Sequence, residues 1–562
     1  MKLLGAEYIV KILELLDAGH LFAYPGGAIL PIYDALAETK LKTVLVRHEQ
    51  AAAYAAQGYA RTLKNKPGFC LATSGPGATN LVTGIADAYA DSIPMMALTG
   101  QVPTHLLGTD AFQETDMTGI CLPFTKKTYL LKNIADSEKV FKEAYELSIN
   151  GRPGPVLIDI PKDVQNTEIE LDDDWEAKFI KPQYKRFYNA HPMAIDKALN
   201  LLVAAKKPLI LTGHGTLLAN AEQELRDFVA SEKIPTISTI LGLGALKHDD
   251  PFYFDWLGMH GMYYANQAIQ QADVIFCIGI RFDDRITGKL DEFAPNAHII
   301  HADIDISEGS KNVPTKVFLH GDIKLLFNHL PSSVTPKNKI YRKEWFEYLD
   351  NMRTKYPLRK PDGKAFTMPY VLDTLNTKTS EGVIITTDVG QHQMWAGQYL
   401  RKILPDCFIT SGGLGSMGFG LPAAMGAQAA QPDKEVWCVS GDGSFLMNIQ
   451  ELITLVQEKW PVKIMLLDNE YLGMVRQWQE QFFDKNYSGV NLTSPNFTKV
   501  AQANGIPSKM VDNPTDLAYA IKLAQETDGP FLIHARVQKE ERVMPMVPPG
   551  ASLSETLYYT TD

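Results

Sequence analysis

Two short segments near the C-terminal end carry residue types that could bind a divalent cation and a diphosphate. The run VWCVSGDG is typical of a strand that ends in a Gly-Asp-Gly turn, and VKIMLLDNEYLG of a strand that ends near Asn469. Mg²⁺ prefers oxygen ligands in near-octahedral geometry, and diphosphate oxygens can complete such a shell. Asp442 would supply a carboxylate, Asn469 a side-chain carbonyl and Tyr471 a backbone carbonyl. Gly441 and Gly443 would let the backbone approach the phosphates where a helix begins.

Either motif alone is more simply explained as a turn, because Gly, Asp and Asn favour turns at strand ends. The combination says more, since Asn469 follows Asp442 by 27 positions and the two strand ends would lie side by side. This pattern resembles the signature of thiamine-diphosphate enzymes, in which Gly-Asp-Gly is followed at similar spacing by Asn. Asp468 stands here where many members have a further Asn.

Glu49, between a predicted strand and a predicted helix, is a candidate for activating such a cofactor. Thiamine chemistry needs a carboxyl group beside N1′ of the aminopyrimidine, so that the 4′-amino group can become the base that removes the C2 proton. The alternative is a simple N-terminal helix charge, stabilised by the helix dipole. The surrounding sequence has to decide between the two.

Short β-rich runs alternate with longer helical patterns along the chain, which predicts α/β layers around parallel sheets. Examples are LKTVLVRH (41–48), GFCLAT (68–73), MMALTG (95–100) and PVLIDIP (155–161). Polar passages at 165–183 and 331–364 are the linker candidates. We therefore expect three domains, each a mainly parallel sheet flanked by helices, at 1–165, 185–335 and 365–537, with a tail or lid at 538–562.

Composition favours a water-soluble globular protein of several domains. The 562 residues are 45% hydrophobic and 21% charged, with a net charge of −11 that argues against binding nucleic acid or an anionic membrane surface. Five scattered cysteines without a CxxC pair predict free thiols. No apolar run reaches the roughly 18 residues that a membrane span requires. The sequence therefore predicts a cytoplasmic protein.

Along essentially its whole length the chain resembles the catalytic large subunits of acetohydroxyacid synthase, the biosynthetic acetolactate synthases. The motifs that carry this resemblance are spread over all three blocks. They include YPGGAILPIYDAL (24–36), RHEQ (47–50), ATSGPGATNLVTGIADA (72–88), GTDAFQE (108–114), GRPGPVLIDIPKDV (151–164), RFDDRITGKL (281–290), DVGQHQMWA (388–396), SGGLGSMGFGLPAA (411–424), SGDGSFLMN (440–448), GMVRQWQ (473–479) and MVPPGASLSE (546–555).

The resemblance implies a reaction, its cofactors and its partners. Such enzymes decarboxylate pyruvate on thiamine diphosphate and transfer the two-carbon unit to pyruvate or 2-ketobutyrate, the first common step of valine, leucine and isoleucine synthesis. Mg²⁺ and FAD would be bound, with no net electron transfer to the flavin. The expected partners are small 2-keto acids, a second copy of the chain in a homodimer or homotetramer, and a small regulatory subunit.

The resemblance also implies that domain 1–165 binds the pyrimidine, 185–335 binds FAD and 365–537 binds the diphosphate, and it implies roles for individual residues. The catalytic set is Glu49, Gly27, Gln113 and Lys162, with Gly26 beside the reacting centre. Thiamine diphosphate would be held by Val389, Gly390, Gln391, His392, Gly415, Met417, Gly441, Asp442, Gly443, Asn469, Tyr471 and Met474, of which Asp442, Asn469 and Tyr471 bind the metal. FAD would contact Arg152, Met259, His260, Arg281, Asp283, Arg285, Asp303 and Asp322. Phe112 and Trp478 would face the substrate, and Trp478 would favour 2-ketobutyrate as acceptor.

Each of these residue types also has an ordinary structural explanation. Met417 and Trp478 could be core residues, Lys162 a surface lysine, and the RFDDR cluster (281–285) a salt-bridge network. Three other functions are weighed against the synthase. An FAD-free catabolic acetolactate synthase should lack RFDDR and Trp478. A flavoenzyme of the pyruvate-oxidase type would use its FAD for redox chemistry. A non-catalytic thiamine fold should have lost Glu49 or Asp442.

Overall fold

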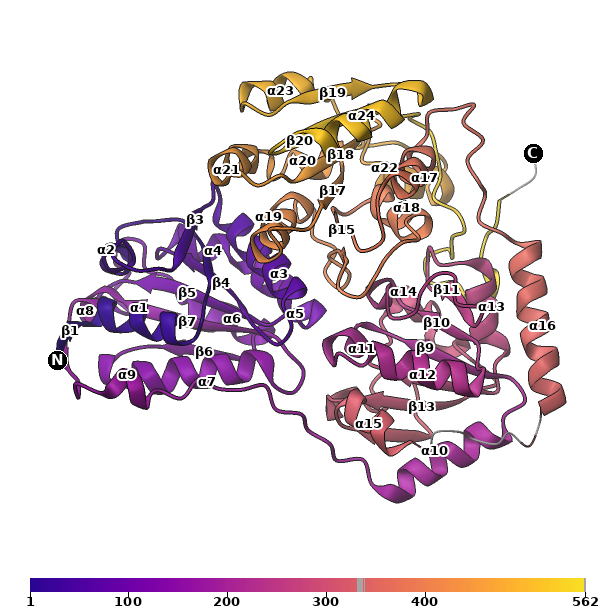
Figure 1. Ribbon diagram of the computed structural model, residues 1–562, viewed down its shortest axis with the longest axis horizontal. Helices are drawn as coiled ribbons and strands as arrows, with labels where there is room; N and C mark the ends of the chain where they lie inside the picture. The colour runs from indigo at the N-terminus through magenta and orange to yellow at the C-terminus, as the bar shows by residue number, and fades with distance from the viewer. Residues whose placement is uncertain (331–336, 338, 560–562) are drawn as a thin grey trace.

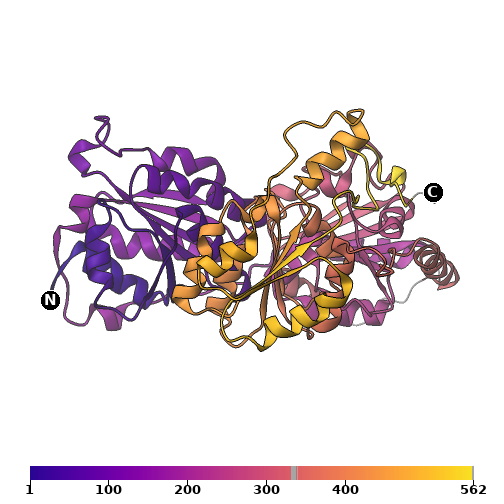
Figure 2. The same ribbon diagram turned by 90° about the horizontal axis from the view of Figure 1, so that it is seen from above.

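The computed structural model describes residues 1–330, 337 and 339–559, which form three α/β units. Each unit contains a six-stranded sheet in which every described strand pairing is parallel. Figure 1 shows the units as indigo-to-purple, magenta and orange-to-yellow lobes, with the third unit above the other two, and in the view from above the third unit overlaps the middle one (Figure 2). The predicted fold class is confirmed.

The first unit has the strand order β3-β2-β4-β5-β7-β6, and β1 pairs with β8 outside that sheet. Its central strands β4 and β5 are buried along their whole length, as expected for a parallel sheet covered on both faces. The strands are β1 (Lys2–Leu4), β2 (His20–Ala23), β3 (Lys42–Leu45), β4 (Gly68–Ala72), β5 (Met95–Gln101), β6 (Lys127–Leu130), β7 (Pro155–Pro161) and β8 (Glu168–Glu170). The helices are α1 (Gly5–Leu15), α2 (Leu30–Leu36), α3 (Glu49–Thr62), α4 (Pro76–Asn80), α5 (Val82–Asp91), α6 (Met117–Cys121), α7 (Ser137–Ile149), α8 (Lys162–Gln165) and α9 (Trp175–Lys178).

The middle unit has the order β11-β10-β9-β12-β13-β14. Its strands are β9 (Pro208–Thr212), β10 (Thr236–Ser238), β11 (Tyr253–Trp256), β12 (Val274–Ile278), β13 (His298–Asp303) and β14 (Val317–His320). Its helices are α10 (Pro192–Ala204), α11 (His214–Leu218), α12 (Glu222–Glu232), α13 (Tyr263–Gln271), α14 (Asp284–Thr287) and α15 (Ile323–His329).

The third unit has the order β16-β15-β17-β18-β20-β19. Its strands are β15 (Ile384–Thr387), β16 (Phe408–Ile409), β17 (Val436–Gly441), β18 (Lys463–Asp468), β19 (Ser508–Val511) and β20 (Phe531–Arg536). Its helices are α17 (Met368–Lys378), α18 (Gln391–Tyr399), α19 (Gly420–Ala430), α20 (Asp442–Phe445), α21 (Leu452–Glu458), α22 (Gly473–Phe482), α23 (Phe497–Ala503) and α24 (Pro514–Glu526), and 3₁₀ turns lie at Ile449–Glu451 and Leu553–Glu555.

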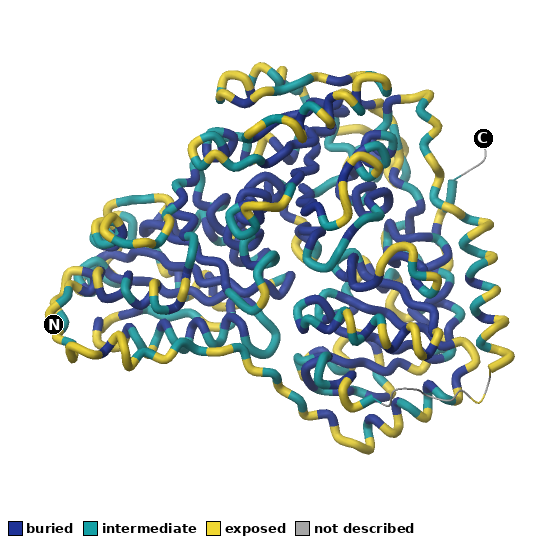
Figure 3. The backbone as a smooth tube through the Cα atoms, viewed as in Figure 1, coloured by how far each residue is buried: buried dark blue, intermediate teal, exposed yellow. Residues whose placement is uncertain are grey.

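The second predicted linker contains a long helix. Residues 331–336 and 338 of that passage lie outside the described residues, but α16 (Lys339–Lys355) follows them. Figure 3 shows α16 largely exposed along one edge, while Trp345 and Leu349 are buried against the middle and third units. Two apolar side chains one turn apart are enough to dock a helix whose other faces are polar.

The prediction of one continuous helix after the Gly-Asp-Gly turn is wrong. The chain forms α20, then the 3₁₀ turn at Ile449–Glu451, and then α21. The interruption lies at Asn448, whose φ of −135° is not helical and whose side-chain amide donates to the Gly418 carbonyl at 2.7 Å. A tertiary hydrogen bond thus replaces helix continuity at this point.

The first and third units share a hydrophobic core through α3 and α19, which lie beside each other in Figure 1. A Cβ on Gly58 would overlap the Ala423 carbonyl, and one on Gly426 would overlap that of Ala55. The helices therefore need small residues in order to approach this closely. Gln431, the residue after α19, donates to the carbonyl of Thr62, the last residue of α3, at 2.9 Å, so the C-terminal ends of the two helices lie together.

The predicted C-terminal tail, residues 538–562, packs against the middle unit through its described part. The Val547 N–H donates to the Met259 carbonyl at 2.7 Å, and the Gln270 amide donates to Ser552 at 2.8 Å. All five cysteines are buried and free, as predicted. Among the described residues, none of the helices has the length and apolar character needed to cross a lipid bilayer.

Candidate active site

The predicted cation and diphosphate residues lie together at one edge of the third sheet. β15, β17 and β18 are neighbours, and Gly441 at the end of β17 pairs in register with Leu467, so Asp442 and Asn469 leave adjacent strand ends. Val389 follows β15 on the same edge, and its carbonyl accepts a hydrogen bond from Ser444 at 2.7 Å. In open parallel sheets this carboxyl edge is the usual place for ligands.

Asp442 is an acidic group in a crowded, buried setting. Burial, and after it the adjoining Asp468 carboxyl, raise the pKa of Asp442. The Ser494 hydroxyl bridges the two acids at 3.3 Å from Asp442 and 2.9 Å from Asp468, whose other oxygen lies 2.7 Å from His534 Nε2. A divalent cation bound at Asp442 would relieve the repulsion between these two buried carboxyls.

The remaining metal ligands would be neutral oxygens. The Asn469 side-chain oxygen accepts the Tyr471 N–H at 3.2 Å and keeps a second lone pair. Among the described residues no three His, Cys, Asp or Glu side chains gather as a metal cluster. A cation here would thus depend on Asp442, on amide and backbone oxygens and on oxygens of its ligand, which suits Mg²⁺ better than Zn²⁺.

Other predicted thiamine-site residues converge on the same edge. His392 is buried, its Nε2 has no hydrogen-bond partner among the described residues, and a Cβ on Gly441 would clash with its ring. Burial lowers the pKa of His392 to about 3, so the ring is neutral. Gly390, with φ 149°, precedes α18, and the Met417 Cε reaches to 3.8 Å from where a Gly443 Cβ would stand. The unpartnered Nε2 of His392 and the space that side chains at Gly441 and Gly443 would fill both fit a bound diphosphate.

The N-terminal candidates form a second group around the turn between β4 and α4. Glu49 is the first residue of α3, is 8% exposed, and accepts a hydrogen bond from Asn80 at 2.9 Å. A Cβ on Gly26 would overlap the Thr73 side chain, and a Cβ on Gly75 would overlap Gln113. Gly26, Glu49 and Gln113 therefore lie around one turn, although they are far apart in sequence.

Lys162 and Phe112 lie at the margin of this group. Lys162 is the first residue of α8, and the Gln165 amide in that helix donates to the Ala28 carbonyl, next to Gly27. Phe112 is 88% exposed on the loop that also carries Gln113, which has a left-handed φ of 61°. An apolar ring that protrudes from a strained loop is typical of a contact made outside the chain itself.

The two groups do not share a cavity within one chain. Val389 and Gly415 line a cavity between the three units, and Glu49 and Gln113 are not among its lining residues. The hydrogen bond that Glu49 accepts from Asn80 lies within the first unit.

A cavity of about 530 Å³ opens between the three units and collects all of the predicted flavin residues. Its lining includes Arg152, Met259, His260, Arg281, Asp283, Arg285, Asp303 and Asp322. The volume is within the range of small-molecule and cofactor sites.

Charged and polar groups in this cavity lack protein partners. The Arg281 guanidinium forms no ion pair within 4.0 Å among the described residues, and the ring of the buried His260 has no hydrogen bond of good geometry there, although the Pro545 carbonyl lies near it. Burial lowers the pKa of His260 to about 4. Arg152 instead pairs with Glu308 at 2.9 Å. An unpaired arginine and an unsatisfied histidine fit an anionic dinucleotide such as FAD.

Two of the predicted flavin contacts already have structural roles. Asp283 caps α14 by accepting the Arg285 N–H at 3.0 Å, and Asp322 caps α15 through the Leu325 N–H at 3.1 Å. Asp322 also pairs with Arg186 at 2.9 Å. A flavin contact by either carboxylate would come in addition to its cap.

The same cavity reaches the thiamine-side residues. Val389, Gly415, Met474 and Trp478 belong to its lining. Trp478 is on α22, and its indole N–H has no partner among the described residues. One chain therefore places the flavin candidates, part of the thiamine set and Trp478 around one continuous space.

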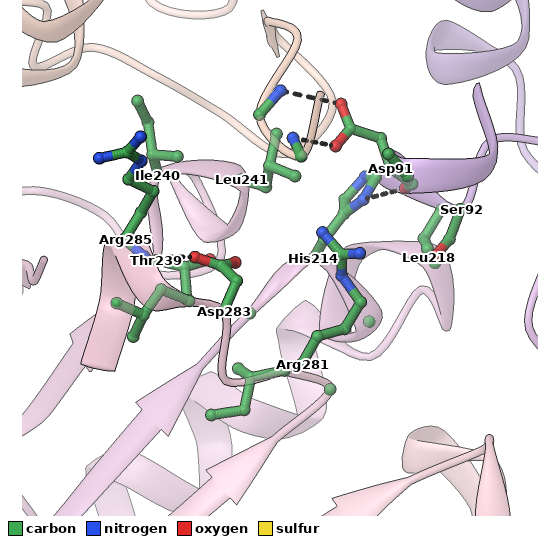
Figure 4. Close-up of a pocket in the computed structure, with 18 of the residues that line it drawn as sticks. Asp91, Ser92, His214, Leu218, Thr239, Ile240, Leu241, Arg281, Asp283 and Arg285 are labelled. Atoms are coloured by element: carbon green, nitrogen blue, oxygen red, sulfur yellow. Dashed lines mark hydrogen bonds between the residues drawn. The ribbon is translucent and has the colours of Figure 1, made fainter. Parts of the chain in front are cut away.

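Sequence reasoning missed two buried acids on α5. Asp91 accepts the Arg61 guanidinium at 2.6 Å. It also accepts the backbone N–H groups of Gly412 and Gly413 at 3.0 and 2.6 Å, which Figure 4 draws as dashed lines. The Asp91 carbonyl bonds the His214 ring of the middle unit at 3.0 Å, so all three units meet at this residue.

Asp87, one turn earlier, accepts the hydroxyls of Ser411 and Ser416, the latter at 2.8 Å. The pair thus fixes the loop that carries Gly415. The sequence does contain a signal for this pair, namely two acids four residues apart on an otherwise apolar helix. Because buried acids need specific partners, this spacing could have identified them.

Comparison with known proteins agrees with this arrangement. The chain matches the N-terminal TPP-binding domain of thiamine pyrophosphate enzymes over residues 3–120, the central domain over 195–330 and the C-terminal TPP-binding domain over 388–535. It is 45% identical to the acetolactate synthase isozyme 2 large subunit of Escherichia coli over 98% of this chain and 99% of that protein. It is 43% identical to the acetolactate synthase large subunit of Corynebacterium glutamicum (99% and 90%) and to the chloroplastic acetolactate synthase 2 of Nicotiana tabacum (98% and 85%). The chain therefore belongs to the acetolactate synthase large subunits, within the thiamine pyrophosphate enzymes.

Proposed function

We propose that this chain is the catalytic subunit of an acetohydroxyacid synthase. It would convert two pyruvates into 2-acetolactate and CO₂, or pyruvate and 2-ketobutyrate into 2-aceto-2-hydroxybutyrate and CO₂, in branched-chain amino-acid synthesis. The observation that carries the proposal is the single cavity lined by Arg281, Val389, Gly415 and Trp478. An FAD-free synthase would need neither the arginine-rich wall nor the tryptophan.

When bound, thiamine diphosphate supplies a nucleophilic carbon for the keto group of pyruvate and an electron sink that lets CO₂ leave. The protein's part is to hold and orient it. Asp442 and the backbone at Gly443 would hold the diphosphate end, and Met417 would support the ring end. Glu49 would keep a proton shared with N1′ of the aminopyrimidine, while Gln113 and Lys162 would face the substrate.

Mg²⁺ and FAD complete the proposed site. Asp442, Asn469 and Tyr471 would hold the metal, which neutralises diphosphate charge and fixes its position. Arg281, unpaired in its cavity, would hold the flavin diphosphate. FAD would here be a bound component without net redox change.

A homodimer is the proposed minimal active unit. Glu49 does not line the cavity of its own chain that contains Val389 and Gly415, which supports a site that takes Glu49 from one subunit and Asp442 from the other. Two relatives are named large subunits, which supports a small regulatory partner for this chain as well. A homotetramer and a cytoplasmic location also belong to the proposal.

The test is purification with cofactor analysis, followed by colorimetric detection of acetoin from the acidified product of pyruvate. We expect activity only with thiamine diphosphate, Mg²⁺ and FAD present, and a flavin spectrum that stays oxidised during turnover. Stoichiometric bleaching of the flavin by pyruvate would instead establish a pyruvate-oxidase type of enzyme. Loss of a charged hydrogen bond in Arg281→Ala should weaken FAD binding about 10-fold or more, read by flavin fluorescence.

A further inference from the structure

The turn that leads into Glu49 is held by a carboxylate of the third unit. β3 ends at Leu45, and the backbone N–H of Arg47 donates to Glu451 Oε1 at 2.8 Å, across 404 residues of sequence. The other oxygen of Glu451 accepts the Thr454 hydroxyl at 2.7 Å. The Arg47 guanidinium reaches the same segment of the third unit and donates to Gln457 at 2.8 Å.

The carboxylate of Glu451 makes its contacts in the protein interior and not on the surface. Its side chain is 0% exposed, as is Thr454. Burial raises the pKa of Glu451 to about 7, because the nearby hydrogen bonds and the Arg47 charge offset the desolvation only in part. A buried acid that is costly to ionise persists where its hydrogen bonds have a specific role.

The backbone that Glu451 holds decides where Glu49 points. Glu49 is the first residue of α3, and the preceding His48 caps that helix by accepting the Gln50 N–H at 3.2 Å. A movement of Arg47 would therefore turn the first residues of α3 as a unit. Displacing a catalytic group by 1 Å can cost about 100-fold in rate.

We propose that Glu451 is a positioning residue that sets Glu49 for cofactor activation by clamping the Arg47 backbone from the third unit. The inference rests on the proposed role of Glu49. It also links two sites. In the proposed dimer, segment 442–451 of one chain holds its own diphosphate through Asp442, and at its other end it positions the glutamate that serves the partner's cofactor.

The experiment measures deuterium exchange at C2 of thiamine diphosphate bound to the intact enzyme, together with cofactor affinity. Glu451→Leu keeps the size but removes the acceptors, so C2 exchange should slow by about 10- to 100-fold while affinity changes little. Glu451→Gln keeps an acceptor for the Arg47 N–H and should restore near-normal exchange. Gln457→Ala removes only the exposed bond to Arg47 and is the matched control, expected to leave exchange unchanged.

The outcomes separate the two hypotheses. If Glu49→Gln leaves C2 exchange unchanged, the proposed role of Glu49 fails. If Glu49→Gln slows exchange but Glu451→Leu does not, the positioning role of Glu451 is wrong. Equal losses in the Leu and Gln variants would also contradict it, because the acceptor would then not matter. Should Glu451→Leu fail to fold, amide exchange in the wild-type enzyme still decides: Arg47 should be as protected as α3, and a rapidly exchanging amide would overturn the clamp.

Discussion

The guanidinium of Arg285 lies over the indole of Trp478, with its carbon 5.7 Å from the ring centroid. The cation–π contact joins the middle unit to α22 of the third unit across the cavity. Phe482 packs on the indole in a T-shaped arrangement at 6.2 Å. The indole is thus fixed from two sides, as a surface that selects a substrate by shape has to be.

Replacement of Trp478 by Leu should change the choice of acceptor more than the rate of the reaction. 2-Ketobutyrate exceeds pyruvate by one methylene, which an apolar surface can distinguish by about 10-fold. We expect Trp478→Leu to lose most of its preference for 2-ketobutyrate in competition assays while still forming acetolactate. Phe483→Leu, which removes an exposed ring from the residue after α22, is the control and should retain the preference. An unchanged product ratio in Trp478→Leu would remove the indole from the acceptor site.

Subunit mixing tests whether the active site is shared between chains. Glu49→Gln and Asp442→Asn should each be inactive alone. In randomly mixed dimers, half are hybrids, and each hybrid has one site with both native residues, so about a quarter of the wild-type activity should return. A site built within one chain predicts no recovery at all. Size-exclusion profiles of the mixture check that dimers have formed.

The sequence predicted those parts of the site that depend on local pattern. A Gly-Asp-Gly turn and an Asn at the ends of two successive strands sufficed to place Asp442 beside Asn469, because parallel neighbours end at one edge. The same reasoning failed for Asp91 and Glu451. Each of them has partners hundreds of residues away, and the relevant contact exists only after two units have docked.

The linker prediction at 331–364 did not reveal the helix α16 for a related reason. Pro, Lys and Ser made the passage resemble a connector, while the stabilisation of α16 depends on burying Trp345 and Leu349 against other elements. Helix propensity and polarity do not reveal such docking, since tertiary packing provides most of the stability of a helix.

Asp159 should make the stability of the protein depend on pH. It lies on β7, accepts hydrogen bonds from Thr99 at 2.6 Å and Gln101 at 2.8 Å, and burial raises its pKa to about 7. The folded-state pKa is above the unfolded value of about 4. The contribution of the neutral acid is therefore fully present below about pH 4 and is lost as pH rises through about 7.

The corresponding variant is Asp159→Asn, which is neutral at every pH. Thermal unfolding should show it to be more stable than the wild type at pH 8, by about 2–4 kcal/mol, and similar to it near pH 4. Asp227→Asn, on the exposed surface of α12, is the control and should follow the wild-type profile. A destabilised Asp159→Asn at pH 8 would mean that the carboxylate form is the one the fold requires.

Gly426→Leu should separate the first and third units by forcing α3 away from α19. A side chain at this position has to displace the Ala55 backbone, which no change of rotamer can relieve. Overpacking of this kind costs about 1–3 kcal/mol or more, and because the two helices share one core the loss should appear as a lower unfolding temperature. The variant should also retain less thiamine diphosphate, since α19 follows directly on the loop of Met417. Ala430→Leu, at the half-exposed end of the same helix, should unfold close to the wild-type temperature; if it falls as far as Gly426→Leu, general intolerance of α19 to bulk explains the result, and the close approach of the two helices does not.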